Sequence, residues 1–135
     1  MTHRFMLDTN VMSALISERG VAVRSRFEQE SSANLCISSV TRGEIGFGLA
    51  KTPEAARRNA TAARLFGIIA SLDWTVRTAV AYAELRATMW RAGKALGPLD
   101  MLIAAHALEI GATLVTADQA FRHVPSLRVE DWSQS

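Results

Sequence analysis

Cysteine is almost absent from this chain, since Cys36 is the only one among its 135 residues. A single thiol excludes an intramolecular disulfide and a cysteine-based zinc site, and its place between Leu35 and Ile37 predicts a small buried strand residue. Long apolar runs are also missing, because none approaches the roughly 20 residues of a membrane helix. The N-terminus has no basic region followed by an apolar signal-like segment. We therefore expect a soluble cytoplasmic protein.

The usual nucleophilic and imidazole catalysts are lacking as well. No Ser/His/Asp constellation is apparent, and His3 and His123 lie away from the other polar motifs. His106 falls in a strongly apolar helical segment, which favours a packed core or supporting histidine over a general base. The chain has no internal repeat and no low-complexity tract. Carboxylates are left as the main candidates for chemistry.

The order of apolar and polar segments predicts the fold class. With 49% hydrophobic and 21% charged residues, the composition is that of one compact domain covering residues 1–135. Strands alternate with helices over five repeats, which predicts an α/β fold with a doubly wound, mainly parallel sheet of about five strands and helices on both faces. The expected strands cover residues 4–7, 34–38, 72–74, 113–116 and 127–129. The expected helices cover residues 10–17, 21–30, 54–71, 77–92 and 101–110, and another starts near residue 40.

Several local signals refine these boundaries. Thr9 or Asn10 is expected to cap the first helix. Pro53 is expected in the first turn of the helix over residues 54–71, where its missing N–H is harmless. Three glycines interrupt the helix that starts near residue 40, at a cost of up to about 1 kcal/mol each relative to alanine. Close backbone packing is the expected reason for them: Gly43, Gly46 and Gly48.

Four acids lie where strands end or helices begin. The apolar run at residues 5–7 stops at Asp8, and Glu44 follows the second strand. Asp100 opens a helix after Gly97-Pro98, and Asp118 follows the strand over residues 113–116. A doubly wound topology gathers such positions at one rim of the sheet, where open α/β sheets bind their ligands. We therefore expect the four carboxylates to share one site.

Each acid also has a purely structural explanation. Thr41-x-x-Glu44 fits a capping box, Asp100 is favoured by the helix dipole, and Asp118 could cap the turn after it. Under this alternative the chain is a catalytically silent module that binds nucleic acid or protein. Convergence of all four acids favours a shared site, because unrelated caps need not lie together.

A shared carboxylate site requires a cation. Carboxylates crowded within a few ångströms cannot all stay ionised without a cation or raised pKa values. With no His or Cys cluster to favour zinc, hard oxygen ligands favour Mg²⁺, with Mn²⁺ as a substitute. Water activated by such an ion can attack a phosphodiester while the ion stabilises the leaving oxygen. The predicted chemistry is metal-dependent phosphodiester hydrolysis.

The net charge of +2 conceals a basic remainder. Setting the four acids aside leaves nine acids against 15 Lys and Arg, so the rest of the chain carries about +6. Arginine accounts for 13 of these bases and binds phosphate bidentately, although genomic base composition also produces an arginine excess. Arg86, Arg91 and Lys94 lead towards Asp100 and could line an RNA path or form a solvated helical face. The tryptophans could stack on bases, but packing in the core or an interface is the favoured interpretation: Trp74, Trp90 and Trp132.

Several motifs together carry a family resemblance. They are Met6-Leu7-Asp8-Thr9-Asn10, residues 37–41 with Glu44, residues 97–108, residues 114–118 and the closing residues 129–132. In this order they resemble the PIN domains of the VapC toxin family nearly end to end. The resemblance implies an Mg²⁺-dependent endoribonuclease, the toxin half of a toxin–antitoxin pair. It also implies an RNA substrate such as tRNA, a homodimer, and inhibition by a VapB-type antitoxin.

Family roles carry over position by position. By resemblance, Asp8 and Asp100 are the principal metal ligands, Glu44 is the second acid and Asp118 is the fourth. The implied catalytic set is Asp8, Glu44, Asp100 and Asp118, supported by Asn10 and Thr116, which do not bind the ion directly. The chain departs from the family at Ala117, where many relatives have a polar Asn. This departure leaves the orientation of Asp118 open.

A phosphatase remains as a rival from another enzyme class. Phosphatases of the haloacid-dehalogenase type also place an acid after the first strand, but they require a second acid at the position of Asn10. Mg²⁺ titration with an RNA substrate and with small phosphate esters would separate the nuclease, the phosphatase and the binding module.

Overall fold

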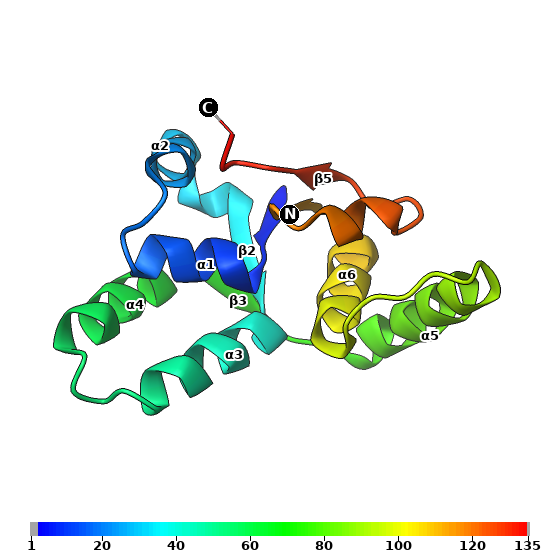
Figure 1. Ribbon diagram of the computed structural model, residues 1–135, viewed down its shortest axis with the longest axis horizontal. Coiled ribbons are helices and arrows are strands. Elements are labelled where there is room, and N and C mark those ends of the chain that lie inside the picture. Colours follow the sequence, from blue (N-terminus) through cyan, green and yellow to red (C-terminus); the bar gives the residue numbers. More distant parts are fainter. Residues whose placement is uncertain (1–2, 135) are drawn as a thin grey trace.

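Five short strands form a parallel sheet at the centre of the structure, a computed structural model that describes residues 3–134 (Figure 1). The strands are β1 (Phe5–Leu7), β2 (Leu35–Ser38), β3 (Ala70–Leu72), β4 (Thr113–Val115) and β5 (Val129–Glu130). Their order across the sheet is β3-β2-β1-β4-β5, and each neighbouring pair is parallel. The predicted α/β fold with a parallel sheet of five strands is confirmed.

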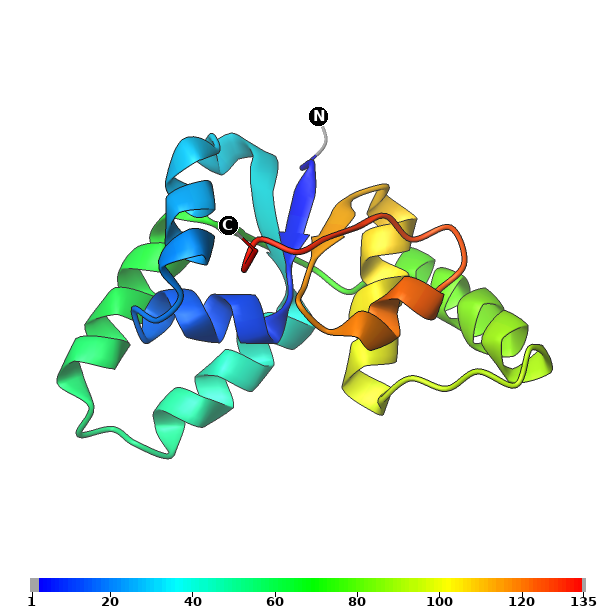
Figure 2. The ribbon, with the colours of Figure 1, turned by 45° about the horizontal axis from the view of Figure 1, so that its top comes forward.

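Helices connect the strands and cover both faces of the sheet (Figures 1 and 2). They are α1 (Thr9–Ile16), α2 (Val21–Gln29), α3 (Ser39–Ala50), α4 (Ala56–Ile68), α5 (Val76–Arg91) and α6 (Pro98–Ile110). Two short 3₁₀ helices, η1 (Ser32–Asn34) and η2 (Gln119–His123), complete the connections. Helices α1, α2 and α4 lie on one side of the sheet, and α5 and α6 lie on the other (Figure 2). Within residues 3–134, none of the helices combines the length and apolar character needed to cross a membrane.

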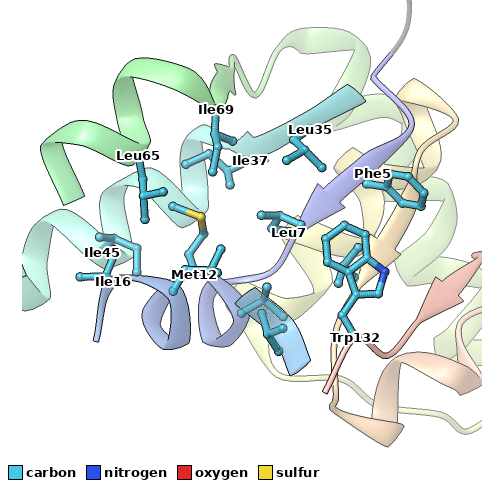
Figure 3. Close-up of a cluster of buried hydrophobic side chains, with 14 of the residues drawn as sticks. Phe5, Leu7, Met12, Ile16, Leu35, Ile37, Ile45, Leu65, Ile69 and Trp132 are labelled. Carbon is cyan, nitrogen blue, oxygen red and sulfur yellow. The ribbon is translucent and has the colours of Figure 1, made fainter. Parts of the chain in front are cut away.

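Alternation along the strands divides the core into two halves. In β1, Phe5 and Leu7 pack against α1 to α4, whereas Met6 packs against α5 and α6. The first half also contains Met12 and Trp132, whose ring meets Phe5 edge-on at 5.2 Å between centroids (Figure 3). Because both faces are covered, the three central strands β1, β2 and β4 are apolar at consecutive positions, whereas the edge strands β3 and β5 are partly exposed and contain Ser71 and Glu130. This double burial explains why short apolar runs predicted the sheet.

The topology places Asp8 at the carboxyl edge of the sheet, where the strand order reverses. Chain order runs from β1 towards β2 and β3 on one side, and β4 and β5 lie on the other side of β1. Leu7 pairs with Val115, and the backbone N–H of Asp8 donates to the Val115 carbonyl at 3.1 Å. Ligands of doubly wound sheets bind at the carboxyl edge where the strand order reverses, between strands such as β1 and β4.

Some predicted boundaries are wrong. The edge strand β3 covers Ala70–Leu72 rather than residues 72–74, and α4 starts at Ala56, so Pro53 lies in the turn before the helix. The close packing predicted for the α3 glycines is also wrong, since a Cβ would meet no atom within 4 Å at any of them: Gly43, Gly46 and Gly48. Cys36, by contrast, is a buried free thiol in β2, as predicted.

Candidate active site

Asp8 lies at the carboxyl end of the central strand and is only 4% exposed. Its Oδ1 accepts a hydrogen bond from the backbone N–H of Val11 at 2.8 Å, so Asp8 caps α1, and the predicted cap at Thr9 or Asn10 is wrong. Burial raises the pKa of Asp8 above its ordinary value of 3.8, because a buried carboxylate loses its hydration. The charges of Asp100 and Asp118 raise this pKa further, against the lowering effect of hydrogen bonds from Thr116 and Val11.

Thr116 connects Asp8 with Asp118. It is buried just after β4, and its Oγ1 accepts a hydrogen bond from the backbone N–H of Asp118 at 3.0 Å. Its hydroxyl donates to Asp8 and so lowers the pKa of that carboxyl. Asp118 is exposed and caps η2, because its Oδ1 accepts from the backbone N–H of Ala120 at 2.9 Å. The orientation of Asp118 is therefore set by Thr116 and the cap, without a polar group at Ala117.

Asp100 lies in the first turn of α6, which starts at Pro98 after the N-cap Gly97. Its carboxylate does not cap the helix, because Gly97 occupies the cap position and no side-chain cap is formed. Partial burial raises the pKa of Asp100 above its ordinary value, and the charges of Asp118 and Glu44 raise it further. The dipole alone therefore does not account for this carboxylate, since its surroundings favour the protonated form.

Glu44 reaches the rim from α3. The N-cap of this helix is Ser38, whose hydroxyl accepts from the backbone N–H of Val40 at 3.1 Å, so the capping box proposed for Thr41 and Glu44 is not formed. Instead, the Thr9 hydroxyl donates to Oε1 of Glu44 at 2.5 Å across 35 positions of sequence. Because Thr9 opens α1 directly after Asp8, this hydrogen bond orients Glu44 towards the end of β1.

The four acids interact electrostatically, with Asp100 in common. The charges of Asp100 and Asp118 raise the pKa of Asp8. The charges of Asp118 and Glu44 raise the pKa of Asp100. Within residues 3–134, no three carboxylate, His or Cys side chains lie close enough together to hold an ion by themselves. Mg²⁺ is commonly bound by one or two carboxylates and several waters, so a pair such as Asp8 and Asp100 fits this ion without a third protein ligand. The donor set is entirely carboxylate, which suits Mg²⁺ or Mn²⁺ rather than zinc.

Comparison with known proteins identifies the family. The PIN domain family model matches residues 5–127. The chain is 37% identical over 131 residues to the tRNA(fMet)-specific endonuclease VapC of Shigella flexneri, covering 96% of this chain and 98% of the relative. This chain belongs to the VapC ribonucleases of the PIN domain family. It is also 32% identical over 130 residues to ribonuclease VapC2 of Haemophilus influenzae strain Rd, with the same coverage.

Solved PIN domain structures match the fold over nearly the whole chain. DNA-bound VapBC from Salmonella typhimurium has a TM-score of 0.89 and 34% identity, covering 98% of this chain and 99% of that one. VapBC2 from Rickettsia felis, bound to a DNA fragment from its promoter, has a TM-score of 0.86 and 28% identity, covering 95% and 98%. The fold predicted from the motifs is thus the fold of the family.

Two contacts of this PIN domain join α3 to α6 and were not predicted. The buried Ser38 hydroxyl lies 2.8 Å from Nδ1 of His106, across 68 positions of sequence. Trp74 forms a second bridge, because its backbone N–H donates to Ser39 Oγ and its Nε1 donates to the Leu102 carbonyl, each at 3.1 Å. These contacts hold the start of α3 against the first turns of α6, and thereby the helices that carry Glu44 and Asp100. His106 is a supporting core histidine, as predicted.

Asn10 and the tryptophans occupy varied positions. Asn10 is exposed at the start of α1 and shares a cavity of about 120 Å³ with Ala117 and Asp118. Trp132 is buried and Trp74 is half-buried, in agreement with the packing interpretation. Trp90 is 80% exposed, so it does not pack in the core of this chain, and its packing in an interface stays a prediction.

Proposed function

We propose that this PIN domain is an Mg²⁺-dependent endoribonuclease and the toxin of a toxin–antitoxin pair. The observation that carries this proposal is Asp8, a buried carboxylate with a raised pKa that faces the charges of two further acids at the point where strand order reverses. A fold gains no stability from such crowding, whereas a divalent cation would be attracted to it. Residues 1–135 act as one nuclease domain in this proposal.

The residues have distinct roles in RNA hydrolysis. Asp8 and Asp100 would hold Mg²⁺, with Mn²⁺ as a substitute, and the bound ion would activate a water for attack on the phosphodiester and neutralise charge on the leaving oxygen. Glu44, oriented by Thr9, and Asp118, oriented by Thr116, would accept hydrogen bonds or a proton from that water. Asn10 lies beside Asp118 and would position the RNA or the water.

The relatives support an RNA substrate and make tRNA the first candidate. The relative from Shigella flexneri is named a tRNA(fMet)-specific endonuclease, and the one from Haemophilus influenzae is named a ribonuclease. The basic remainder of the chain, with 13 arginines, favours a polyanionic partner. Because its RNA substrates are cytoplasmic, we place the protein in the cytoplasm.

A VapB-type antitoxin is the proposed protein partner, because the solved relatives from Salmonella typhimurium and Rickettsia felis are VapBC complexes. A cavity of about 70 Å³ between α1, α3 and α4 is lined by apolar residues, by Glu44 and by Arg58; the apolar ones are Ile16, Ile45 and Leu49. An apolar tail could pack there and extend an arginine to the carboxylates, with which it would pair bidentately. Homodimerisation is likewise part of the proposal, by resemblance to the family.

The test is cleavage of purified tRNA and of an unstructured RNA by the recombinant protein in Mg²⁺, in Mn²⁺ and in excess EDTA. We expect cleavage with either ion and none in EDTA. Asp100→Asn should abolish cleavage while leaving the circular dichroism spectrum unchanged. Glu28→Gln is the matched control, since Glu28 is an exposed acid on α2, a helix that carries none of the four site acids. This variant should cleave RNA normally.

Other outcomes would select the rival functions. Full activity in EDTA would refute the metal mechanism. Phosphate release from small esters without RNA cleavage would indicate a phosphatase. RNA or protein binding with no hydrolysis at all would favour the silent module, in which the carboxylates act as helix caps, as Asp8 and Asp118 do here.

A further inference from the structure

Trp90 is the most exposed aromatic side chain among residues 3–134, with 80% of its surface accessible near the end of α5. Tryptophan is costly to expose, because its large ring is mostly apolar. Its neighbours do not cover it, since α5 packs mainly on α6 (Figure 2). Leu85 and Met89 are buried in that contact, whereas Trp90 lies outside it. An aromatic ring presented in this way is available to a ligand.

Trp90 ends a row of side chains that begins beside the helix carrying Asp100. Tyr82, Arg86 and Trp90 are spaced four residues apart, so they lie along one side of α5. Arg86 Nη1 donates to the Tyr82 hydroxyl at 2.8 Å. Tyr82 packs edge-on against Trp74 with 6.0 Å between ring centroids, and Trp74 Nε1 donates to Leu102, two residues after Asp100. The row therefore connects α6 near the candidate site with the exposed end of α5.

This row is accompanied by unpaired positive charge. Arg86, Arg91 and Lys94 are all exposed, and no ion pair within residues 3–134 involves any of them. The one acid on α5, Glu84, lies on a different side of the helix, beside Leu108 and Pro125. The loop of residues 92–97, which contains Lys94, then returns directly to the first turn of α6 (Figure 2). Cations thus follow the row without compensation from carboxylates.

Exposed aromatic rings between cations are the features that bind unpaired nucleotides. Bases stack on aromatic side chains and on arginine, while positive charge follows the phosphates. A second copy of this chain that met this face symmetrically would bring its own three cations against these, which is unfavourable. We propose that Trp90, with Arg86 and Lys94, forms a stacking subsite for an unpaired nucleotide of the RNA substrate, outside the carboxylate rim. This subsite rests on the proposed ribonuclease function.

The test measures RNA binding separately from cleavage. Fluorescence anisotropy of a labelled unpaired oligoribonucleotide, in EDTA, should give an affinity about 5- to 100-fold weaker for Trp90→Ala than for the wild-type protein. Trp90→Phe should stay within about threefold of wild type, because phenylalanine also stacks. Arg86→Gln should weaken binding, whereas Glu84→Gln on the other side of α5 should not. A duplex RNA of the same length should show little dependence on Trp90.

The outcomes also separate this proposal from the ribonuclease function. Unchanged oligoribonucleotide affinity for Trp90→Ala in a protein that cleaves RNA would overturn the subsite alone. Weaker binding in a protein that never cleaves RNA would overturn the nuclease and leave the subsite standing. Sedimentation velocity supplies the last control. If Trp90→Ala converts a dimer to a monomer, the exposed face is a contact with a second copy of this chain, and the proposal is wrong.

Discussion

Replacing Asp8 by asparagine in the metal-free protein should leave the free energy of unfolding unchanged or raise it. Asp8 has two opposing effects on stability. Its Oδ1 caps α1 through Val11, and its buried charge faces Asp100 and Asp118. Asparagine is as good a cap as aspartate but carries no charge, so Asp8→Asn keeps the favourable effect and removes the unfavourable one. Asp8→Ala removes both, and loss of the cap costs about 1 kcal/mol.

The assay is urea unfolding in EDTA at pH 7, with Asp8→Asn and Asp8→Ala compared in parallel. For a chain of this length, 1 kcal/mol corresponds to about 3 to 4 °C in melting temperature, so thermal unfolding also resolves the pair. We expect the asparagine variant to be more stable than the alanine variant by about 1 kcal/mol or more. If Asp8→Asn destabilises the protein as much as Asp8→Ala, the charge is favourable in the folded state and the reasoning is refuted.

The pH dependence supplies an independent check. Because burial raises the pKa of Asp8 above 3.8, this group stabilises the fold fully below that pH, and the contribution is lost as pH rises through the raised pKa. Asparagine resembles the protonated form at every pH. The stability gained by Asp8→Asn should therefore be smallest near pH 4 and largest at pH 7. A gain that grows towards acid would contradict the raised pKa.

With a divalent ion present, wild type should become more stable than Asp8→Asn. Ligand at 100 times its dissociation constant stabilises a folded protein by about 2.7 kcal/mol, or about 10 °C here. Wild type should gain this stabilisation in Mg²⁺ or Mn²⁺, and Asp8→Asn should gain much less. Equal stabilisation of the two proteins would show that Asp8 does not bind the ion.

Three further predictions concern individual side chains and a fourth concerns the partner. Thr9→Val should lower kcat by about 10-fold or more by releasing Glu44, whereas Thr9→Ser should retain activity. Burial raises the pKa of Cys36 to about 12, so a thiol reagent at pH 8 should label it only after denaturation. Burial lowers the pKa of His106, so its contribution to the free energy of unfolding should be full above about pH 6.5 and decline as the pH falls below that. Urea unfolding of wild type and His106→Leu across this pH range measures that contribution. The complex with antitoxin should bind Mn²⁺ more weakly than the free protein, as measured by calorimetry. Equal Mn²⁺ affinities of the free protein and the complex would show that the antitoxin does not inhibit by displacing the ion.

Local sequence patterns were sufficient for the fold class. Apolar runs such as that of residues 5–7 predicted strands buried on both faces, and the helical segments between them required crossover connections and hence a parallel sheet. The same patterns placed Asp8 at a strand end, where the carboxyl edge binds ligands. These inferences succeed because side-chain period and chain connection are properties of neighbouring residues.

Only the tertiary structure decided the features that depend on distant neighbours. The edge strand at Ala70–Leu72 is defined by its pairing with β2, and Pro53 is compatible with both a turn and a first helical turn. The sequence around the α3 glycines did not indicate that a side chain at these positions would face open space. The exposure of Trp90 was equally undetermined, because the helical pattern is the same whether or not another element covers that side.

For the carboxylate site, too, some features were predictable from the sequence and others depend on the tertiary structure. Residue types and spacing predicted a shared carboxylate site, and that site stays a prediction. The hydrogen bond from Thr9 to Glu44 and the contact of Ser38 with His106 span 35 and 68 positions of sequence. No periodicity predicts such contacts, since they arise from strand order and helix packing. The direction of the Asp8 pKa shift is likewise a tertiary property. It depends on how much water the folded chain removes from the carboxylate and on which other charges the fold brings close.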